Sequence, residues 1–149
     1  MDNDEKAIDI LLVDDGDDDV VITQRAFKKG KLLNNLYIAR SGQEALDFIY
    51  HEGKYQDNPV PTPGLILLDI NMPNMNGFQV LEKLKSNPKY CMIPIIMLTI
   101  SDRDEDIVRS YRNGAVSYIT KPINFDGFVK IIEQFEIYWS MVSRIPHVV

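Results

Sequence analysis

Short, mostly apolar runs alternate along this chain with longer segments in which apolar residues recur at helical spacing. Such runs are typical of strands that are buried on both faces. Five strands are predicted, at residues 8–13, 36–39, 65–68, 93–98 and 116–119. The segments that follow them predict five helices, at residues 17–29, 41–50, 76–87, 101–112 and 124–143.

Residues that favour helix ends support these boundaries. Ser41 and Glu44 have the S-x-x-E spacing of a capping box at the start of the second helix. The first helix opens on aspartates and closes on lysines before Gly30, an order that suits the helix dipole. Residues 54–64 carry three prolines and predict a loop.

Strands that alternate with helices predict βαβ units with right-handed crossovers. The expected fold class is therefore α/β, a doubly wound five-stranded parallel sheet with helices on both faces. In such sheets, functional groups gather beyond the carboxyl ends of the strands, near a topological switch point. The residues just after each apolar run are therefore the candidates for chemistry.

Composition narrows the class of protein. The chain has 149 residues, enough for one domain with a real core, and 45% of them are hydrophobic. Its formal net charge is −6, which argues against nucleic-acid binding through a basic surface. The single cysteine, Cys91, lies in an apolar context and is expected to be a core or near-core residue in a reducing compartment.

The ends of the chain carry no targeting signal that we recognise. The acidic first ten residues lack the apolar region of a signal peptide, and no apolar run is long enough to cross a bilayer. We therefore expect a cytoplasmic protein with no membrane contact. The expected organisation is an N-terminal tail at 1–7, one domain at 8–143 and a C-terminal tail at 144–149.

Polar side chains follow four of the predicted strands. Asp14 and Asp15 follow the first strand, Asp69 the third, Thr99 the fourth and Lys121 the fifth. Because the carboxyl ends of parallel strands meet at one edge, these groups are expected to converge there. Three carboxylates at one edge repel one another, and a bound divalent cation relieves that repulsion. Carboxylate oxygens are ligands that Mg²⁺ prefers, so the pattern predicts a magnesium site.

The run of aspartates continues beyond this predicted metal site. Gly16 is expected to let the chain turn, and residues 17–19 to cap and charge the first helix. Only Asp14 and Asp15, of the five aspartates in this run, are therefore expected to need a cation.

Asp69 directly follows the most apolar run in the chain. A carboxylate can act as a nucleophile that accepts a phosphoryl group and forms an acyl phosphate. Such a transfer needs in-line placement and neutralisation of the phosphoryl oxygens. A metal ion, the ammonium of Lys121 and the hydroxyl of Thr99 provide that neutralisation.

Several stretches, taken in order, resemble one family. LLVDD, LILLDINMPNMNG, IPIIMLT and NGAVSYITKP are similar to the response-regulator receiver domains of the CheY-like family. The resemblance covers nearly the whole chain and implies a flavodoxin-like (βα)5 fold with strand order 2-1-3-4-5. It also implies a signalling protein rather than an enzyme, one that catalyses only its own phosphorylation and dephosphorylation.

The resemblance assigns roles to the residues at the strand ends. Asp69 matches the phosphoacceptor, and Asp14 and Asp15 match the acidic pair that binds Mg²⁺ together with it. Asn71 matches the residue whose backbone carbonyl completes the metal site.

The resemblance also covers the residues that respond to phosphorylation. Thr99 and Lys121 match the hydroxyl and the ammonium that meet the phosphoryl group, and Tyr118 matches an aromatic switch. The bond between Lys121 and Pro122 resembles a cis peptide of the family. The implied partners are a sensor histidine kinase or phosphotransfer protein and an unknown downstream protein.

Two segments depart from the commonest receivers. The loop at residues 51–63 is long, as in stand-alone receivers paired with bacteriophytochrome-type sensor kinases, although a surface insertion without a role fits equally well. The final helix has more apolar residues than one packing face needs. Its expected core stripe consists of residues 125, 128, 129, 132, 135 and 139. A second apolar set consists of residues 131, 138, 141 and 142. The second apolar set is expected to meet either the tail at residues 144–149 or a second subunit, and a homodimer through the fourth helix, fifth strand and fifth helix is favoured.

Other readings fit the residues less well. A Mg²⁺-dependent phosphatase of the haloacid-dehalogenase type also uses an aspartate nucleophile, but its second acid lies two positions on, where this chain has Asn71. The acidic run lacks the alternation and distal glutamate of a calcium-binding EF-hand loop. No G-x-G-x-x-G follows the first strand, so dinucleotide binding is not indicated.

Overall fold

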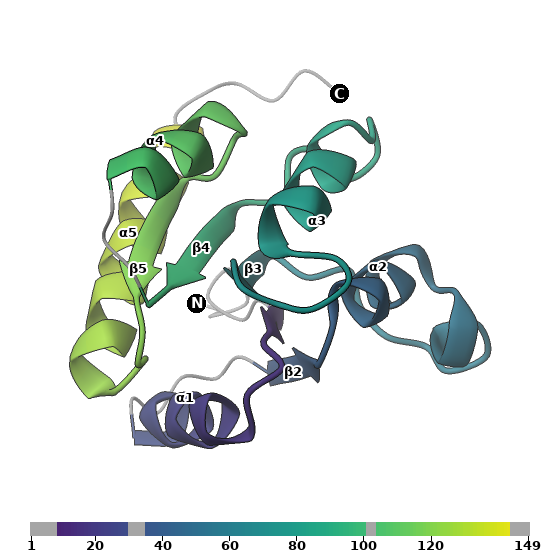
Figure 1. The fold of residues 1–149 in the computed structure, drawn as a ribbon, viewed down its shortest axis with the longest axis horizontal. Coiled ribbons are helices and arrows are strands. Elements are labelled where there is room, and N and C mark those ends of the chain that lie inside the picture. Colours follow the sequence, from purple (N-terminus) through teal and green to yellow (C-terminus); the bar gives the residue numbers. More distant parts are fainter. Residues whose placement is uncertain (1–8, 30–34, 101–103, 144–149) are drawn as a thin grey trace.

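The structure, a computed structural model, describes residues 9–29, 35–100 and 104–143, with residues 104 and 135–143 described by their backbone alone. Five strands alternate with five α-helices and one 3₁₀ turn (Figure 1). In chain order these elements are β1 (Asp9–Val13), α1 (Asp17–Lys29), β2 (Asn35–Ala39), α2 (Gly42–Tyr50), η2 (Gly53–Tyr55), β3 (Leu65–Asp69), α3 (Gly77–Lys85), β4 (Ile95–Thr99), α4 (Asp104–Arg112), β5 (Ser117–Thr120) and α5 (Phe125–Ser143).

The strands form one parallel sheet in the order β2-β1-β3-β4-β5, which confirms the predicted fold class and strand order. The order reverses between β1 and β3, so this is the switch point of the sheet. Val13 is paired with Leu68 and Asp69 with Leu98. This register brings the carboxyl ends of β1, β3 and β4 to the same edge.

Two hydrophobic cores lie on opposite faces of the sheet. Alternate residues of β3 point to opposite faces, so Leu65 and Leu67 enter one core while Ile66 and Leu68 enter the other. Helices α1 and α5 cover the first face, and α2 and α3 cover the second. Every residue of β3 and β4 is buried, as the apolar runs predict.

Most element boundaries lie within a few residues of the predicted ones. Helix α3 begins one residue later than predicted, because Asn76 is its N-cap and forms a capping box with Gln79, and it ends at Lys85 rather than at residue 87. Strand β4 begins at Ile95 rather than at residue 93. Several predicted segments lie outside the described residues: the strand residue Ile8, the helix start at 101–103 and both tails. Cys91 is half-buried, so it lies near the core rather than in it.

The predicted core stripe of α5 is wrong in part. Phe125 and Val129 are 38% and 36% exposed, whereas Ile131, expected on the second stripe, is fully buried. Phe128 is buried as predicted and meets Phe27 of α1 edge-on, with ring centroids 4.9 Å apart. The helix is therefore rotated relative to the expectation. The side chains of the predicted residues from 135 onward are not among those described.

The long loop after α2 is packed against the domain. The Tyr55 hydroxyl donates to Glu44 at 2.7 Å, and its ring lies edge-on to Phe48 at 5.1 Å between centroids. Lys54 pairs with the same carboxylate at 3.1 Å, and a ring nitrogen of His51 lies 2.9 Å from the Val60 carbonyl oxygen. The insertion is therefore an ordered part of the α2 surface.

The chain turns closely around the end of β3 at Gly77. A Cβ at this position would lie 2.3 Å from the Asp69 carbonyl oxygen and 2.8 Å from the Ile70 Cα. The Gly77 N–H donates to the Ile70 carbonyl at 2.9 Å. Only glycine lets α3 begin this close to the strand that carries Asp69.

Gly77→Ala is expected to lower the free energy of unfolding by about 1–3 kcal/mol, because backbone atoms must shift to admit the new methyl group. Gly127→Ala is the matched control, since a Cβ there meets nothing nearer than 3.5 Å. Alanine in that helix is expected to stabilise the protein by up to about 1 kcal/mol. Urea unfolding of both variants checks this, and equal effects would contradict the packing at Gly77.

Candidate functional site

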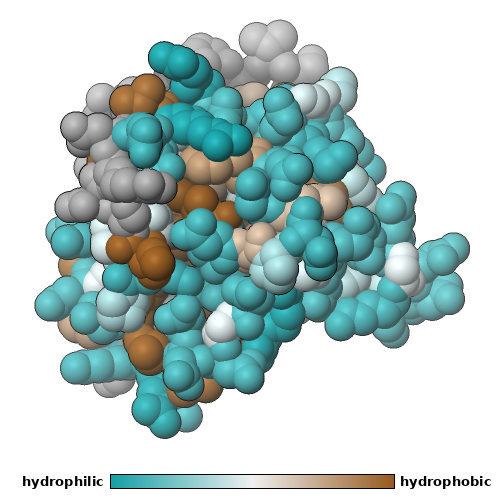
Figure 2. Space-filling view, in the orientation of Figure 1, coloured by the Kyte–Doolittle hydropathy of each residue, from teal (hydrophilic) through white to brown (hydrophobic). Residues whose placement is uncertain are grey.

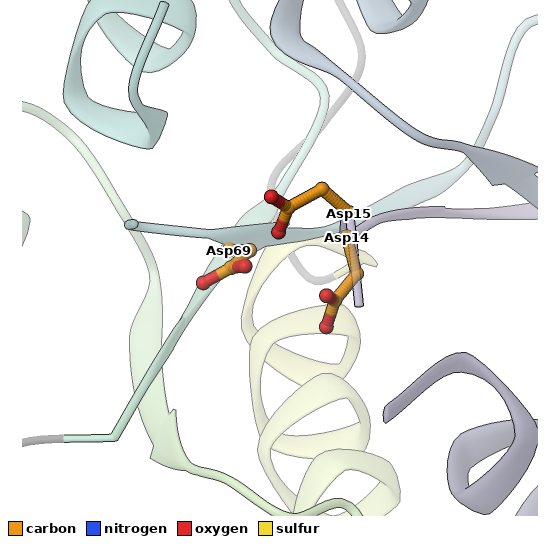
Figure 3. Close-up of side chains that lie close together, drawn as sticks. All are labelled: Asp14, Asp15 and Asp69. Atoms are coloured by element: carbon orange, nitrogen blue, oxygen red, sulfur yellow. The ribbon is translucent and has the colours of Figure 1, made fainter. Parts of the chain in front are cut away.

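Three carboxylates meet at the switch point of the sheet. Asp14 and Asp15 directly follow β1, and Asp69 ends the neighbouring strand β3. One oxygen from each residue can be chosen so that all three lie within 4.8 Å of one another (Figure 3). Asp14 and Asp69 are buried, whereas Asp15 is exposed. This set of hard oxygen donors, open on one side, fits a divalent cation that keeps part of its water shell.

Backbone N–H groups orient two of these carboxylates. The Gly16 N–H donates to Asp14 Oδ1 at 2.9 Å, and the Asn71 N–H donates to Asp69 Oδ1 at 3.2 Å. Such bonds from the following turn fix each carboxylate toward the sheet edge. The Asn71 side chain is exposed, which is compatible with a role for its backbone rather than its side chain.

Lys121 places a buried ammonium among these acids. Its Nζ lies 3.2 Å from Asp14, 2.8 Å from Asp19 and 3.3 Å from Asp69, and its side chain is 8% exposed. The Lys121 N–H donates to the Thr99 carbonyl at 2.7 Å, which ties the loop after β5 to the end of β4. The bond between Lys121 and Pro122 is cis, as the resemblance implies.

Burial and charge shift the titration of both central groups. Burial raises the pKa of Asp69 to about 6; nearby Lys121 opposes this rise, and the Asp14 carboxylate adds to it. Burial alone would lower the pKa of Lys121, but the hydrogen bond to Asp19 and the charges of Asp69 and Asp14 raise it above its ordinary value. The site thus holds a firmly protonated lysine beside the Asp69 carboxyl, whose pKa is raised.

The two remaining predicted site residues occupy different surroundings. Thr99 is 2% exposed at the end of β4, where its strand neighbour is Thr120. Tyr118 is half-buried in β5, and its ring lies edge-on to Tyr111 of α4 at 6.2 Å. Thr99 therefore belongs to the sheet edge that carries the acids. Tyr118 belongs to the surface formed by α4, β5 and α5.

Only Asp14 and Asp15 of the acidic run belong to the described group of acids that could hold a metal ion, as expected, but two of the other aspartates do more than cap α1. Asp17 pairs with Arg40, and Asp19 makes the shortest of the three ion pairs of Lys121. Both were expected only to cap and charge α1. A helix that follows a strand begins at the edge where that strand ends, so the sequence places the first turn of α1 near this edge. Whether the Asp19 side chain turns toward Lys121 depends on how α1 packs, which the sequence does not specify.

This fold and site define a receiver domain. The chain matches the family model described as "Response regulator receiver domain" over residues 10–133 and belongs to that family. It is 34% identical to Response regulator Rcp1 of Synechocystis sp. over 137 residues, which cover 92% of each protein. It is therefore a response-regulator signalling protein rather than a catalytic enzyme, and the phosphatase alternative is not supported.

Solved structures agree with this assignment. The bacteriophytochrome response regulator AtBRR is 37% identical with a TM-score of 0.79, and the match covers 89% of this chain and 95% of AtBRR. The phosphorylated cyanobacterial phytochrome response regulator RcpA is 32% identical with a TM-score of 0.75, covering 94% and 97%. One similar structure of Rcp1 is a Mn²⁺-bound form. In the described part of this chain, no helix is both long and apolar enough to span a membrane.

The raised pKa of Asp69 predicts pH-dependent metal binding. Between about pH 4 and 6 the folded protein holds a proton on Asp69 that the unfolded chain has released, so this group's contribution to stability falls as pH rises through that window. A divalent cation needs the carboxylate form. Calorimetric titration with Mg²⁺ is therefore expected to show affinity that is clearly weaker at pH 5 than at pH 7.5.

Asp69→Asn is the control for this titration, because it removes the titrating group and keeps the side-chain shape. Its residual Mg²⁺ affinity is expected to depend much less on pH. Equal wild-type affinity at the two pH values would contradict the placement of Asp69 in the metal site.

Proposed function

We propose that Asp69 accepts a phosphoryl group from a phosphohistidine of a sensor histidine kinase or phosphotransfer protein, with Mg²⁺ held by Asp14, Asp15 and Asp69. The observation that carries this proposal is the position of Asp69, buried at the end of a central strand between Asp14 and Lys121. An Asp69 oxygen forms a bond to phosphorus as the bond from phosphorus to the imidazole nitrogen breaks. The products are an acyl phosphate and a neutral histidine when the phosphohistidine ring carries a proton on its other nitrogen.

The surrounding charges support this transfer. Phosphoryl transfer needs its acceptor and donor in line and its developing charge neutralised, and little else from the protein. The ammonium of Lys121, 3.3 Å from Asp69, provides a fixed positive charge for a phosphoryl oxygen. Mg²⁺ held by Asp14, Asp15 and Asp69 would supply a second source of positive charge that offsets the negative charge of the phosphoryl group. We assign the backbone carbonyl of Asn71 to the same metal site.

The response to phosphorylation is proposed to pass through Thr99, Lys121 and Tyr118. The Lys121 N–H is bonded to the Thr99 carbonyl, so the ends of β4 and β5 are linked. A new negative charge on Asp69 favours a state in which the Thr99 hydroxyl and the Lys121 ammonium move toward it. Tyr118, two residues along β5 from Thr120, would change its packing against α4 in that state.

The surface formed by α4, β5 and α5 is the proposed partner-binding face. A cavity of about 480 Å³ lies there, lined by Tyr111, Tyr118 and Lys130 among others. Val108 and Tyr111 are exposed hydrophobic side chains on α4, and Figure 2 shows several apolar patches on this side of the molecule. We propose that a downstream protein or a second copy of the chain binds here, and sedimentation at high concentration tests the homodimer.

The likeness to AtBRR and RcpA supports a phytochrome-type sensor kinase as the phosphoryl donor. The long loop after α2, which is also expected of receivers paired with such kinases, is ordered against the domain in this chain. The donor's identity is a proposal that rests on those relatives, which are phytochrome response regulators.

Intact mass after incubation with acetyl phosphate and Mg²⁺ tests the acceptor. The wild type is expected to gain ~80 Da, the mass of one phosphoryl group on a carboxylate nucleophile. Asp69→Asn is expected to gain nothing, and removal of Mg²⁺ by a chelator is expected to abolish the gain in the wild type. Asp57→Asn, which changes an exposed loop aspartate, controls for general labelling and is expected to match the wild type. An adduct that persists in Asp69→Asn would overturn the assignment.

A further inference from the structure

Among the described residues that pair with Lys121, Asp19 is the one that belongs neither to the metal-ligand group nor to the acceptor. Its Oδ2 lies 2.8 Å from the Lys121 Nζ, closer than either Asp14 at 3.2 Å or Asp69 at 3.3 Å. Asp19 is absent from the group of acids that come within metal-binding distance of one another among the described residues. Its interaction with Lys121 therefore has a purpose separate from holding a cation.

The local structure of α1 directs this carboxylate toward Lys121. Asp19 lies in the first turn, where the Val20 N–H donates to the Gly16 carbonyl and Thr23 Oγ1 donates to the Asp19 carbonyl at 2.8 Å. Gly16 leaves the space that the carboxylate occupies, since a Cβ there would lie 3.0 Å from Asp19 Oδ2. The Asp19 side chain is 33% exposed, so it approaches the buried ammonium from the solvent side.

The ammonium of Lys121 has three N–H donors, and three carboxylates surround it. When Asp69 is phosphorylated, its carboxylate becomes an acyl phosphate, and a phosphoryl oxygen must then share the Lys121 ammonium with Asp14 and Asp19. A metal ion draws on Asp14 and Asp69 but not on Asp19. Asp19 therefore still competes with a phosphoryl oxygen for the Lys121 ammonium when the metal is bound.

Resting on the proposed acceptor role of Asp69, we propose that Asp19 is a positioning residue that restrains Lys121 and competes with the phosphoryl group for its ammonium. The competition sets how much phosphodonor is needed to fill the site. The negative charge of Asp19 also raises the amount of phosphodonor needed, because a carboxylate beside the pocket disfavours an added anion. In this way the first turn of α1 is coupled to the phosphorylation state of Asp69.

The test is a titration of acetyl phosphate at pH 7.5 with saturating Mg²⁺, with the phosphorylated fraction read by intact mass. Asp19→Asn is expected to lower the acetyl phosphate concentration at half-phosphorylation by about three- to tenfold, the effect of losing a partly exposed charge-assisted contact. Asp19→Glu keeps the carboxylate and is expected to stay close to the wild type.

Asp18→Asn is the matched control, because Asp18 carries the same charge in the same turn and is exposed. It is expected to shift the half-point by less than about twofold, the scale of a solvent-screened charge. Equal shifts in Asp18→Asn and Asp19→Asn would reduce the effect to general charge and overturn the positioning role. No shift in Asp19→Asn would overturn it as well.

A second measurement does not depend on phosphorylation. The ¹⁵N NMR signal of the Lys121 ammonium in metal-free protein is expected to move in Asp19→Asn and to stay in place in Asp18→Asn. An unmoved signal in Asp19→Asn would overturn the restraint itself. A wild type that gains no adduct on Asp69 would instead overturn the proposed function and, with it, the competition, even where the signal moves as expected.

Discussion

The ammonium of Lys121, held among Asp14, Asp19 and Asp69, is the interaction on which the site depends. Three carboxylates this close together would repel one another strongly at low effective dielectric. One buried lysine balances part of that charge and leaves a site that is still negative. The remaining charge is what makes the pocket suited to a divalent cation, and the cation in turn makes it suited to a phosphoryl group. The Lys121 ammonium and the three carboxylates thus determine both the arrangement of the metal-free site and the ligands that it can bind.

The sheet provides the geometry that this cluster needs. Because β1, β3, β4 and β5 are parallel and in register, their carboxyl ends deliver Asp14, Asp69, Thr99 and the loop of Lys121 to one edge. Buried apolar residues on both faces fix these strands, and Gly77 lets α3 begin directly against the backbone of Asp69. The proposed partner-binding face, the surface of α4, β5 and α5, shares β5 with the site. A change at Lys121 is therefore close in the chain to the face that a partner would meet.

Apolar runs and helix caps were sufficient to predict the fold class, and the parallel sheet then required Asp14 and Asp69 to converge. Three features could not be obtained in this way, because each depends on how elements pack. The rotation of α5, which buries Ile131 and exposes Phe125, is ambiguous in a helix with apolar residues on several sides. The contact of Asp19 with Lys121 joins residues about a hundred positions apart. The loop after α2 is held in place because Tyr55 and Lys54 contact Glu44. The roles of Thr99, Tyr118 and Asn71 remain predictions.

The most direct test of this account is the free energy of unfolding of the wild type and of Lys121→Met, measured in urea at pH 7.5 with a chelator and with increasing Mg²⁺. In chelator, Lys121→Met is expected to be less stable by about 3 kcal/mol, because buried carboxylates lose their counter-charge. Mg²⁺ is expected to stabilise both proteins and to recover more stability in Lys121→Met, where no ammonium competes for the acids. Equal stability of the two proteins in chelator, or stability that does not change with Mg²⁺ in either, would contradict the account.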